Sequence, residues 1–162
     1  MHALSLLARI DRLQEQLAVR LAPLAAFATR AILGHAFVLT GLGKLRNLER
    51  TSDFFASLGI PLPGSHAVGI GLLELVGGAL LVLGLRTRTF AALLSATMIV
   101  ALATADRSTL LEYLQLSGEP GFTQVVPLTF LVLLGWLFVN GAGRWSFDQR
   151  LASSDRTRME SR

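Results

Sequence analysis

The sequence predicts an all-α integral membrane protein: a polytopic four-helix bundle with an amphipathic, interfacial helix at its N-terminal side. Two observations lead to this class. Of the 162 residues, 52% are hydrophobic and only 16% are charged, whereas soluble domains carry about 25% charged residues. The charges also cluster, so that long apolar runs separate them. Because a membrane span needs about 20 mostly apolar residues, four of these runs are long enough to cross a bilayer.

Residues 1–21 are the first predicted element, an amphipathic helix. Their apolar residues recur at steps of three and four, which places them on one helical face: Leu6, Ile10, Leu13, Leu17, Leu21 and Leu24. Charged residues interrupt the segment, unlike the continuous apolar core of a signal peptide. A helix lying on the inner leaflet and a helix that binds a partner protein are both compatible with this pattern.

Residues 22–149 contain the four predicted spans, and residues 150–162 are a polar tail that we expect in the cytoplasm. The spans cover residues 23–43, 67–85, 89–105 and 122–143. The third is free of charged and strongly polar side chains, whereas the others carry Arg30 and His35, Glu74, and Asn140 respectively. These intramembrane polar residues are the first candidates for a site, because such residues are costly in lipid.

The distribution of Lys and Arg predicts that both termini are cytoplasmic, since cytoplasmic loops retain basic residues. Arginines are frequent in residues 1–21, at 86–88 and in 144–162. Between the third and fourth spans there is one, Arg107, among three acidic residues. The connection between the first two spans argues mildly against this orientation, with Lys44, Arg46 and Arg50. Topology accounts for the net charge of +4, so no nucleic-acid partner is expected.

The chain contains no cysteine, which excludes disulfides, thiolate nucleophiles, cysteine-ligated zinc and iron–sulfur clusters within it. No metal site is predicted, because nothing places His35 and His66 at facing depths for haem ligation. No covalently bound cofactor is expected either, and the sequence identifies no catalytic residue.

Two stripes of small residues carry the charged residues of the first two spans. In the first span the stripe steps by three and four through Ala26, Arg30, Gly34, Phe37, Gly41 and Lys44. In the second it passes through Ala67, Gly71, Glu74 and Gly78. Small residues allow membrane helices to approach closely, so we expect the two stripes to face other helices. Glu74 is then either protonated or paired with a base.

The candidate intramembrane polar site consists of Arg30, His35, Lys44, Glu74, Arg88 and Asn140. We hypothesise that Glu74 pairs with Lys44 or Arg30 and lines a polar pocket between the first two spans. A purely structural ion pair, or a protonated Glu74 bonded across helices, is one interpretation. A role in handling protons, quinone or substrate is the other, since intramembrane acids are often functional.

Four segments, in order, resemble the DoxX family: LGHAFVLTGLGKL at 33–45, FFASLGIPLP at 54–63, LLELVGGALLVLGLRTR at 72–88 and GAGRWSFD at 141–148. The likeness covers roughly residues 28–149. It implies a four-helix protein of the bacterial inner membrane, associated with sulfur-compound oxidation or oxidative-stress complexes, and in some relatives with quinone. The polar residues that match are Arg30, Lys44, Glu74, Arg88 and residues 144–148. Many members have a histidine at the end of the third span, where this chain has Thr104, Ala105 and Asp106.

Three functions remain open at this point. The first is the membrane subunit of a redox complex, which would need quinone or a soluble redox partner because the chain has no electron carrier of its own. The second is a small proton-coupled transporter that uses Glu74. The third is a non-catalytic scaffold. Besides the lipid bilayer, the sequence identifies neither partner nor substrate, and it leaves the oligomeric state open.

Overall fold

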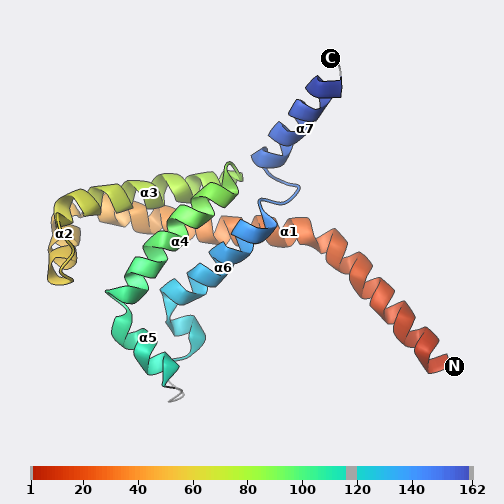
Figure 1. Cartoon of the computed structure of the whole chain (residues 1–162), viewed down its shortest axis with the longest axis horizontal. Coiled ribbons are helices and arrows are strands. Elements are labelled where there is room, and N and C mark those ends of the chain that lie inside the picture. The colour runs from red at the N-terminus through yellow and green to blue at the C-terminus, as the bar shows by residue number, and fades with distance from the viewer. Residues whose placement is uncertain (1, 116–119, 161–162) are drawn as a thin grey trace.

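The structure is a computed structural model that describes residues 2–115 and 120–160, and the regular elements among them are helices (Figure 1). In chain order they are α1 (His2–Arg46), α2 (Leu48–Ser57), α3 (Pro63–Leu83), α4 (Thr87–Ala103), α5 (Arg107–Leu114), a 3-10 turn η1 (Phe122–Gln124), α6 (Val126–Asn140) and α7 (Phe147–Glu160). The predicted all-α class is confirmed. Apolar runs become helices here because a helix pairs all of its backbone groups internally, which lipid requires.

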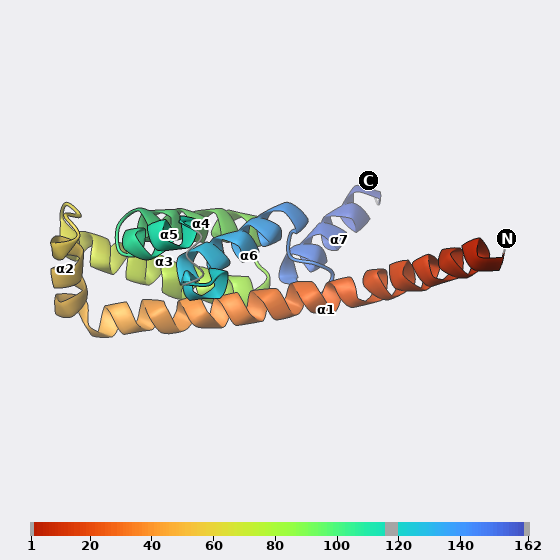
Figure 2. The ribbon, with the colours of Figure 1, turned by 90° about the horizontal axis from the view of Figure 1, so that it is seen from below.

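Helix α1 is a single helix of 45 residues, about 68 Å long at 1.5 Å per residue. The predicted amphipathic segment and the first predicted span therefore lie on one continuous helix. Pro23 lies inside it, and proline removes one internal hydrogen bond. The N-terminal part of α1 extends away from the other helices (Figure 2), and its side chains from Arg9 to Ala22 are exposed.

Two helices, α1 and α3, are long and apolar enough to cross a membrane, and α4 with α5 would make a third if that pair is one span. The axes of α4 and α5 differ by 80°. Helix α6 has only 15 residues, about 22 Å, which is short of the bilayer's hydrocarbon core of about 30 Å. The chain is thus a membrane protein with two or three spans by length and composition, and the fourth span remains a prediction.

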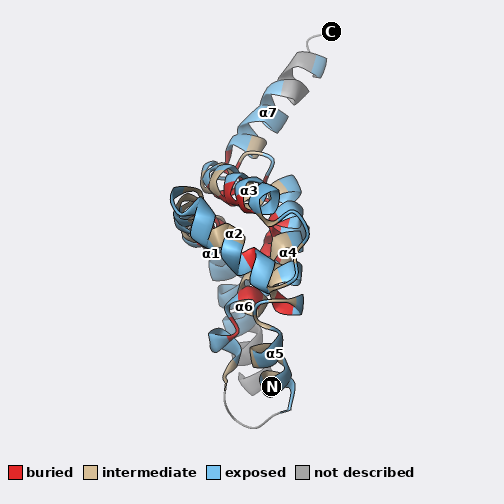
Figure 3. Cartoon of the chain, turned by 90° about the vertical axis from the view of Figure 1, so that its left-hand side faces the viewer, coloured by how far each residue is buried: buried red, intermediate tan, exposed pale blue. Residues whose placement is uncertain are grey.

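The helices pack mainly as two pairs, α1 with α3 and α4 with α6, which meet where α3 contacts α4. The buried core lies between them and consists of Leu33, Phe37, Leu81, Ala91, Leu94, Leu134 and Leu137. Seen end-on in Figure 3, buried residues lie where the helices face one another, and the outer surfaces are exposed. Many of the exposed side chains are large and apolar, among them Ile32, Leu39 and Val139, as expected for lipid-facing helices.

Helices α1 and α3 touch through four glycines, Gly34, Gly41, Gly71 and Gly78, which we call the glycine seam. A Cβ atom added to Gly34 would lie 2.5 Å from the carbonyl oxygen of Gly78, and one added to Gly41 would lie 2.5 Å from the backbone nitrogen of Leu75. No side chain fits at these two positions without separating the helices. The prediction that the small-residue stripes face other helices is confirmed, since each stripe meets the other.

Candidate functional site

The glycine seam brings the one carboxylate of α3 against α1. The Nζ atom of Lys44 lies 2.5 Å from Oε2 of Glu74, and the two side chains are 26% and 4% exposed. Lys44 stands in the last turn of α1, one turn beyond Gly41, and Glu74 stands one turn beyond Gly71 on α3. The hypothesised pairing of Glu74 with a base of the first span is therefore present, and Lys44 is the base.

A cavity of about 170 Å³ lies beside this pair, and we call it the ion-pair cavity. Its walls come from the last turn of α1, from α2, α3 and α4, and from the connections after α2 and α4. The hypothesised polar pocket between the first two spans is therefore wrong in its place and polarity, because α2, α4 and the connections that follow them supply most of the walls and these are mainly apolar. Lys44 and Glu74 are the charged residues among its lining, and the other residues are Phe54, Phe55, Leu58, Ile60, Ile70, Thr97, Met98, Val100, Ala101, Thr104 and Ala105. A mostly apolar cavity with a few converging polar groups is the usual form of a small-molecule site.

The pair still has hydrogen-bonding capacity for a ligand. Lys44 has three N–H donors, and one of them is used by Glu74. Within the described part of the chain, the Oε1 atom of Glu74 accepts no hydrogen bond. A second, more open hollow of about 470 Å³ adjoins Lys44 on the side of Thr40, Asn47 and Arg50. Lys44 thus lies between the ion-pair cavity and an open surface.

Arg30 lies at the other end of the seam and does not meet Glu74. Its side chain is fully buried and donates to three backbone carbonyls: Nη1 to Leu81 at 3.5 Å and to Val82 at 3.4 Å, and Nη2 to Trp145 at 2.6 Å. We call this group the arginine clamp. The first two carbonyls belong to the last turn of α3, where helix carbonyls lack their regular i+4 partners; the carbonyl of Leu81 also accepts from the N–H of Gly84 at 3.0 Å. Arg30 thereby ties the end of α3 to the segment after α6.

Gly84 makes room for the arginine clamp. It ends α3 with φ of +68°, a conformation that glycine adopts readily. A Cβ atom at this position would overlap the guanidinium group of Arg30. Two features therefore require glycine at position 84: the positive φ of the turn and the space that the guanidinium group of Arg30 occupies.

Asp148 fixes the beginning of α4. Its two carboxylate oxygens accept hydrogen bonds from the backbone N–H groups of Arg86, at 2.7 Å, and Thr87, at 2.9 Å. Arg86 precedes α4 with φ of +52°, which is uncommon for a residue other than glycine, and its own side chain makes no cap there. We did not derive this role of Asp148 from the sequence. The available signal was the motif at 141–148, which the family resemblance included.

The remaining candidates lie apart from the ion-pair cavity. Arg88 is exposed and donates from Nη2 to the carbonyl of Val139 at 3.1 Å. Asn140 is exposed and donates to the carbonyl of Trp136 on its own helix. His35 is exposed on α1. The six candidates therefore do not form one site: Lys44 and Glu74 are together at one end of the seam, Arg30, Arg88 and Asn140 are near the other, and His35 faces outward.

The described residues hold no group of three or more His, Asp or Glu side chains that could bind a metal ion. The groups that could bind a small molecule are the N–H donors of Lys44, the free carboxylate oxygen of Glu74 and the aromatic walls of the cavity. Thr104 and Ala105 also line it.

Comparison with known proteins agrees with the motifs. The DoxX family model matches residues 25–107, about half of the chain. The "Putative oxidoreductase CatD" of Bacillus subtilis is 41% identical over 75 residues, which are 46% of this chain and 54% of that protein. The chain thus spans about half the length of this relative. The "Uncharacterized membrane protein Rv3486" of Mycobacterium tuberculosis is 30% identical over 135 residues, 80% of this chain and 83% of that protein. No solved structure matches significantly.

Proposed function

This chain belongs to the DoxX family, and from that premise we propose that it is the membrane subunit of a redox complex that binds quinone in the ion-pair cavity. The observation that carries the proposal is a buried carboxylate, paired with a half-buried lysine, at the wall of an apolar cavity. The proposal also includes placement in the bacterial inner membrane with both termini in the cytoplasm.

The chemistry of the cavity lining fits a quinone ring. The ring is flat and apolar, and its two carbonyl oxygens accept hydrogen bonds. Phe54, Phe55 and Met98 offer apolar surface, and Lys44 retains N–H donors that can reach into the cavity. Glu74 holds the ammonium group of Lys44 in place through their hydrogen bond. A bound quinone would supply reversible uptake of electrons and protons, which no side chain of this chain supplies.

The name of one relative also supports a redox role, since the Bacillus subtilis protein carries the name "Putative oxidoreductase CatD". The chain has no cysteine, so it has no thiolate ligands for an iron–sulfur cluster. We therefore propose that electrons come from a soluble partner protein in sulfur-compound oxidation or in the response to oxidative stress.

A proton-coupled transporter is the alternative that Glu74 suggests. In the structure Lys44 occupies one oxygen of this carboxylate, so a cationic substrate would have to displace the ammonium group. A site for a neutral acceptor such as quinone requires no such displacement. Substrate-driven proton movement in liposomes would favour the transporter, and the absence of both activities would leave a scaffold.

The test is equilibrium binding of a short-chain quinone to the purified protein in lipid nanodiscs. We expect Lys44→Met to bind about tenfold more weakly, because a hydrogen bond from a charged group contributes about 1.5–3 kcal/mol. Glu74→Gln should weaken binding by a smaller factor, because glutamine keeps its hydrogen bond with Lys44 but holds the ammonium group without the attraction between opposite charges. Glu49→Gln is the matched control, since Glu49 is an exposed acid in the first turn of α2. Equal binding by all four proteins would contradict a quinone site in this cavity.

A further inference from the structure

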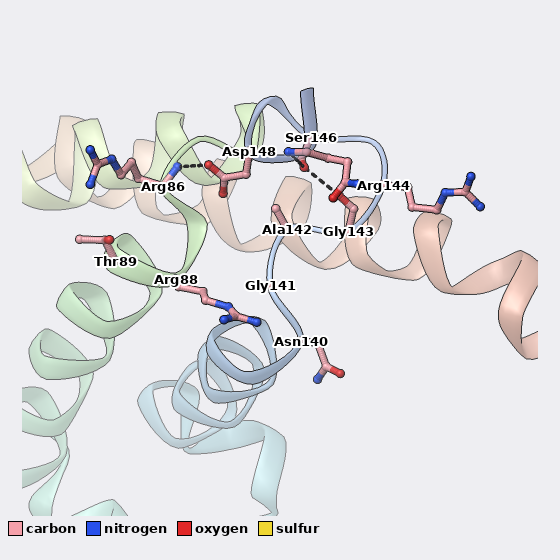
Figure 4. A pocket seen from close by; sticks show the side chains of 11 residues that line it. Arg86, Arg88, Thr89, Asn140, Gly141, Ala142, Gly143, Arg144, Ser146 and Asp148 are labelled. Carbon is pink, nitrogen blue, oxygen red and sulfur yellow. Dashed lines mark hydrogen bonds between the residues drawn. The ribbon is translucent and has the colours of Figure 1, made fainter. Parts of the chain in front are cut away.

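We propose that another cavity, at the end of the seam opposite the ion-pair cavity, binds the phosphate group of an anionic lipid. It measures about 440 Å³ and lies where α4 begins, α6 ends and the chain passes from α6 to α7 (Figure 4). We call it the arginine pocket, after its lining residues Arg86, Arg88 and Arg144. It does not depend on the proposed quinone site, because the two cavities share no residue.

The lining of the arginine pocket carries an excess of positive charge. Three arginines and one acid, Asp148, give a formal charge of 3 − 1 = +2. Both oxygens of Asp148 already accept hydrogen bonds, one from the backbone N–H of Arg86 (Figure 4) and one from that of Thr87. Among the described residues, this acid makes no hydrogen bond to any of the three guanidinium groups. A hollow lined by uncompensated charge of one sign attracts a counter-ion.

Two of the three guanidinium groups have their donors available. That of Arg88 donates to the carbonyl of Val139. Within residues 2–115 and 120–160, those of Arg86 and Arg144 have no hydrogen-bond or ion-pair partner. They point away from the pocket on opposite sides (Figure 4), so binding of one phosphate group requires these long side chains to turn towards it. Each presents five N–H donors in a planar fork, which matches the oxygens of a phosphate group.

The surroundings favour a lipid over a free phosphate ion. Arg144 also lines two neighbouring cavities, one with Trp136 and one with Arg20 and Trp145. Trp145 is 61% exposed, and the apolar side chains of Phe138 and Val139 are exposed near the end of α6. Tryptophan is enriched at the level of lipid headgroups. Arginines for a phosphate thus adjoin apolar surface for acyl chains, as in the basic headgroup pockets between membrane helices.

Native mass spectrometry of the full chain in detergent, titrated with phosphatidylglycerol, tests the proposal. Because each basic residue strengthens the binding of anionic lipid by about fivefold, we expect Arg86→Gln and Arg144→Gln each to weaken binding by that factor. Phosphatidylcholine should bind more weakly to the unchanged protein. Arg46→Gln is the matched control, since Arg46 is exposed at the opposite end of α1 and lines neither cavity.

Charge-preserving variants separate loss of contact from loss of fold. Arg86→Lys and Arg144→Lys should weaken binding less than the Gln variants do, because lysine keeps the charge but lacks the planar fork, and all variants should unfold at similar temperatures. If Arg46→Gln weakens binding as much as Arg144→Gln, the attraction is a general effect of charge and the proposal is wrong. If inorganic phosphate at millimolar concentration displaces the lipid, the pocket is a site for free anions and the lipid assignment is also wrong.

Discussion

The two ends of the glycine seam use buried charge in different ways. Arg30 and Lys44 lie on the same stripe of α1, fourteen residues and about 21 Å apart. At one end Arg30 donates to the backbone carbonyls of three residues. At the other end Lys44 donates to a single side chain, Glu74, beside a cavity. Arg30 holds segments of the chain together, whereas Lys44 and its partner Glu74 can also form hydrogen bonds with a ligand in the cavity.

This difference separates a structural role from a candidate functional role for residues of the same chemical kind. Backbone carbonyls at a helix end cannot move without unfolding that end, so the arginine clamp is committed to the fold. A side-chain pair can exchange partners without moving a helix. We therefore expect substitutions at the clamp to affect mainly stability, and substitutions at the ion pair to affect mainly ligand binding.

The largest effect is expected from Arg30→Met, which keeps the aliphatic stem but removes all hydrogen bonds of the arginine clamp. We expect a loss of about 3 kcal/mol in the free energy of unfolding, because hydrogen bonds from a charged donor are lost and the carbonyls of Val82 and Trp145 lose the donor that Arg30 supplies. Unfolding by titration with SDS from mixed micelles measures it. Arg46→Met, an exposed residue of the same helix, should change little. A loss below about 1 kcal/mol for Arg30→Met would show that the clamp does not hold the fold.

Gly34→Ala tests the glycine seam, the close contact of α1 with α3 that lies between the arginine clamp and the ion pair. The added Cβ atom would lie 2.5 Å from the carbonyl oxygen of Gly78, and overpacking of this kind costs about 1–3 kcal/mol. Gly43→Ala is the matched control, because a Cβ atom at Gly43 meets nothing within 4 Å. The same unfolding assay should show destabilisation for Gly34→Ala alone. Equal stability of the two variants would contradict the close contact of α1 with α3.

Asp148→Ala removes the hydrogen-bond acceptor for the beginning of α4. We expect a loss of about 1 kcal/mol, the usual value for a helix cap. Asp53→Ala, at an exposed position in α2, serves as the control. If Asp148→Ala leaves the stability unchanged, the segment 141–148 is not held through this carboxylate, and the contrast between the two ends would rest on Arg30 alone.

The smallest effect on stability is expected from Glu74→Gln. Glutamine still accepts a hydrogen bond from Lys44, and Lys44 is 26% exposed, so its charge is partly solvated. We expect a change of less than about 1 kcal/mol, as for ion pairs that reach solvent, together with the weaker quinone binding predicted above. A loss of stability as large as that of Arg30→Met would remove the contrast and indicate a structural role for both ends.

Much of the fold could be predicted because membrane helices are encoded locally. Apolar runs marked α3 and α4 to within a few residues, and the spacing of Gly34, Gly41, Gly71 and Gly78 predicted their burial. The lengths of elements were less predictable. Helix α1 continues through Pro23, because the loss of one hydrogen bond does not end a helix that is otherwise favoured. The sequence alone does not show that α6 stops after 15 residues.

The candidate site could be predicted only in part. Glu74 stands out from the sequence because a carboxylate within an apolar run needs a partner, and the stripes restricted that partner to a few bases. Asp148 and the carbonyl of Trp145 do not stand out, because a backbone carbonyl has no sequence signature. The resemblance identified the segment that contains both residues without stating what they contact.

By itself, the sequence determined that this is a helical membrane protein of the DoxX family with a buried acid facing a neighbouring helix. These properties follow from composition and from spacing along one helix. Only the tertiary structure decided which basic residue pairs with Glu74 and which one donates to the backbone carbonyls at the end of α3 and of Trp145. Arg30 and Lys44 lie on the same stripe and carry the same charge. Their roles differ because the antiparallel packing of α1 and α3 places one beside the last turn of α3 and the other beside the carboxylate.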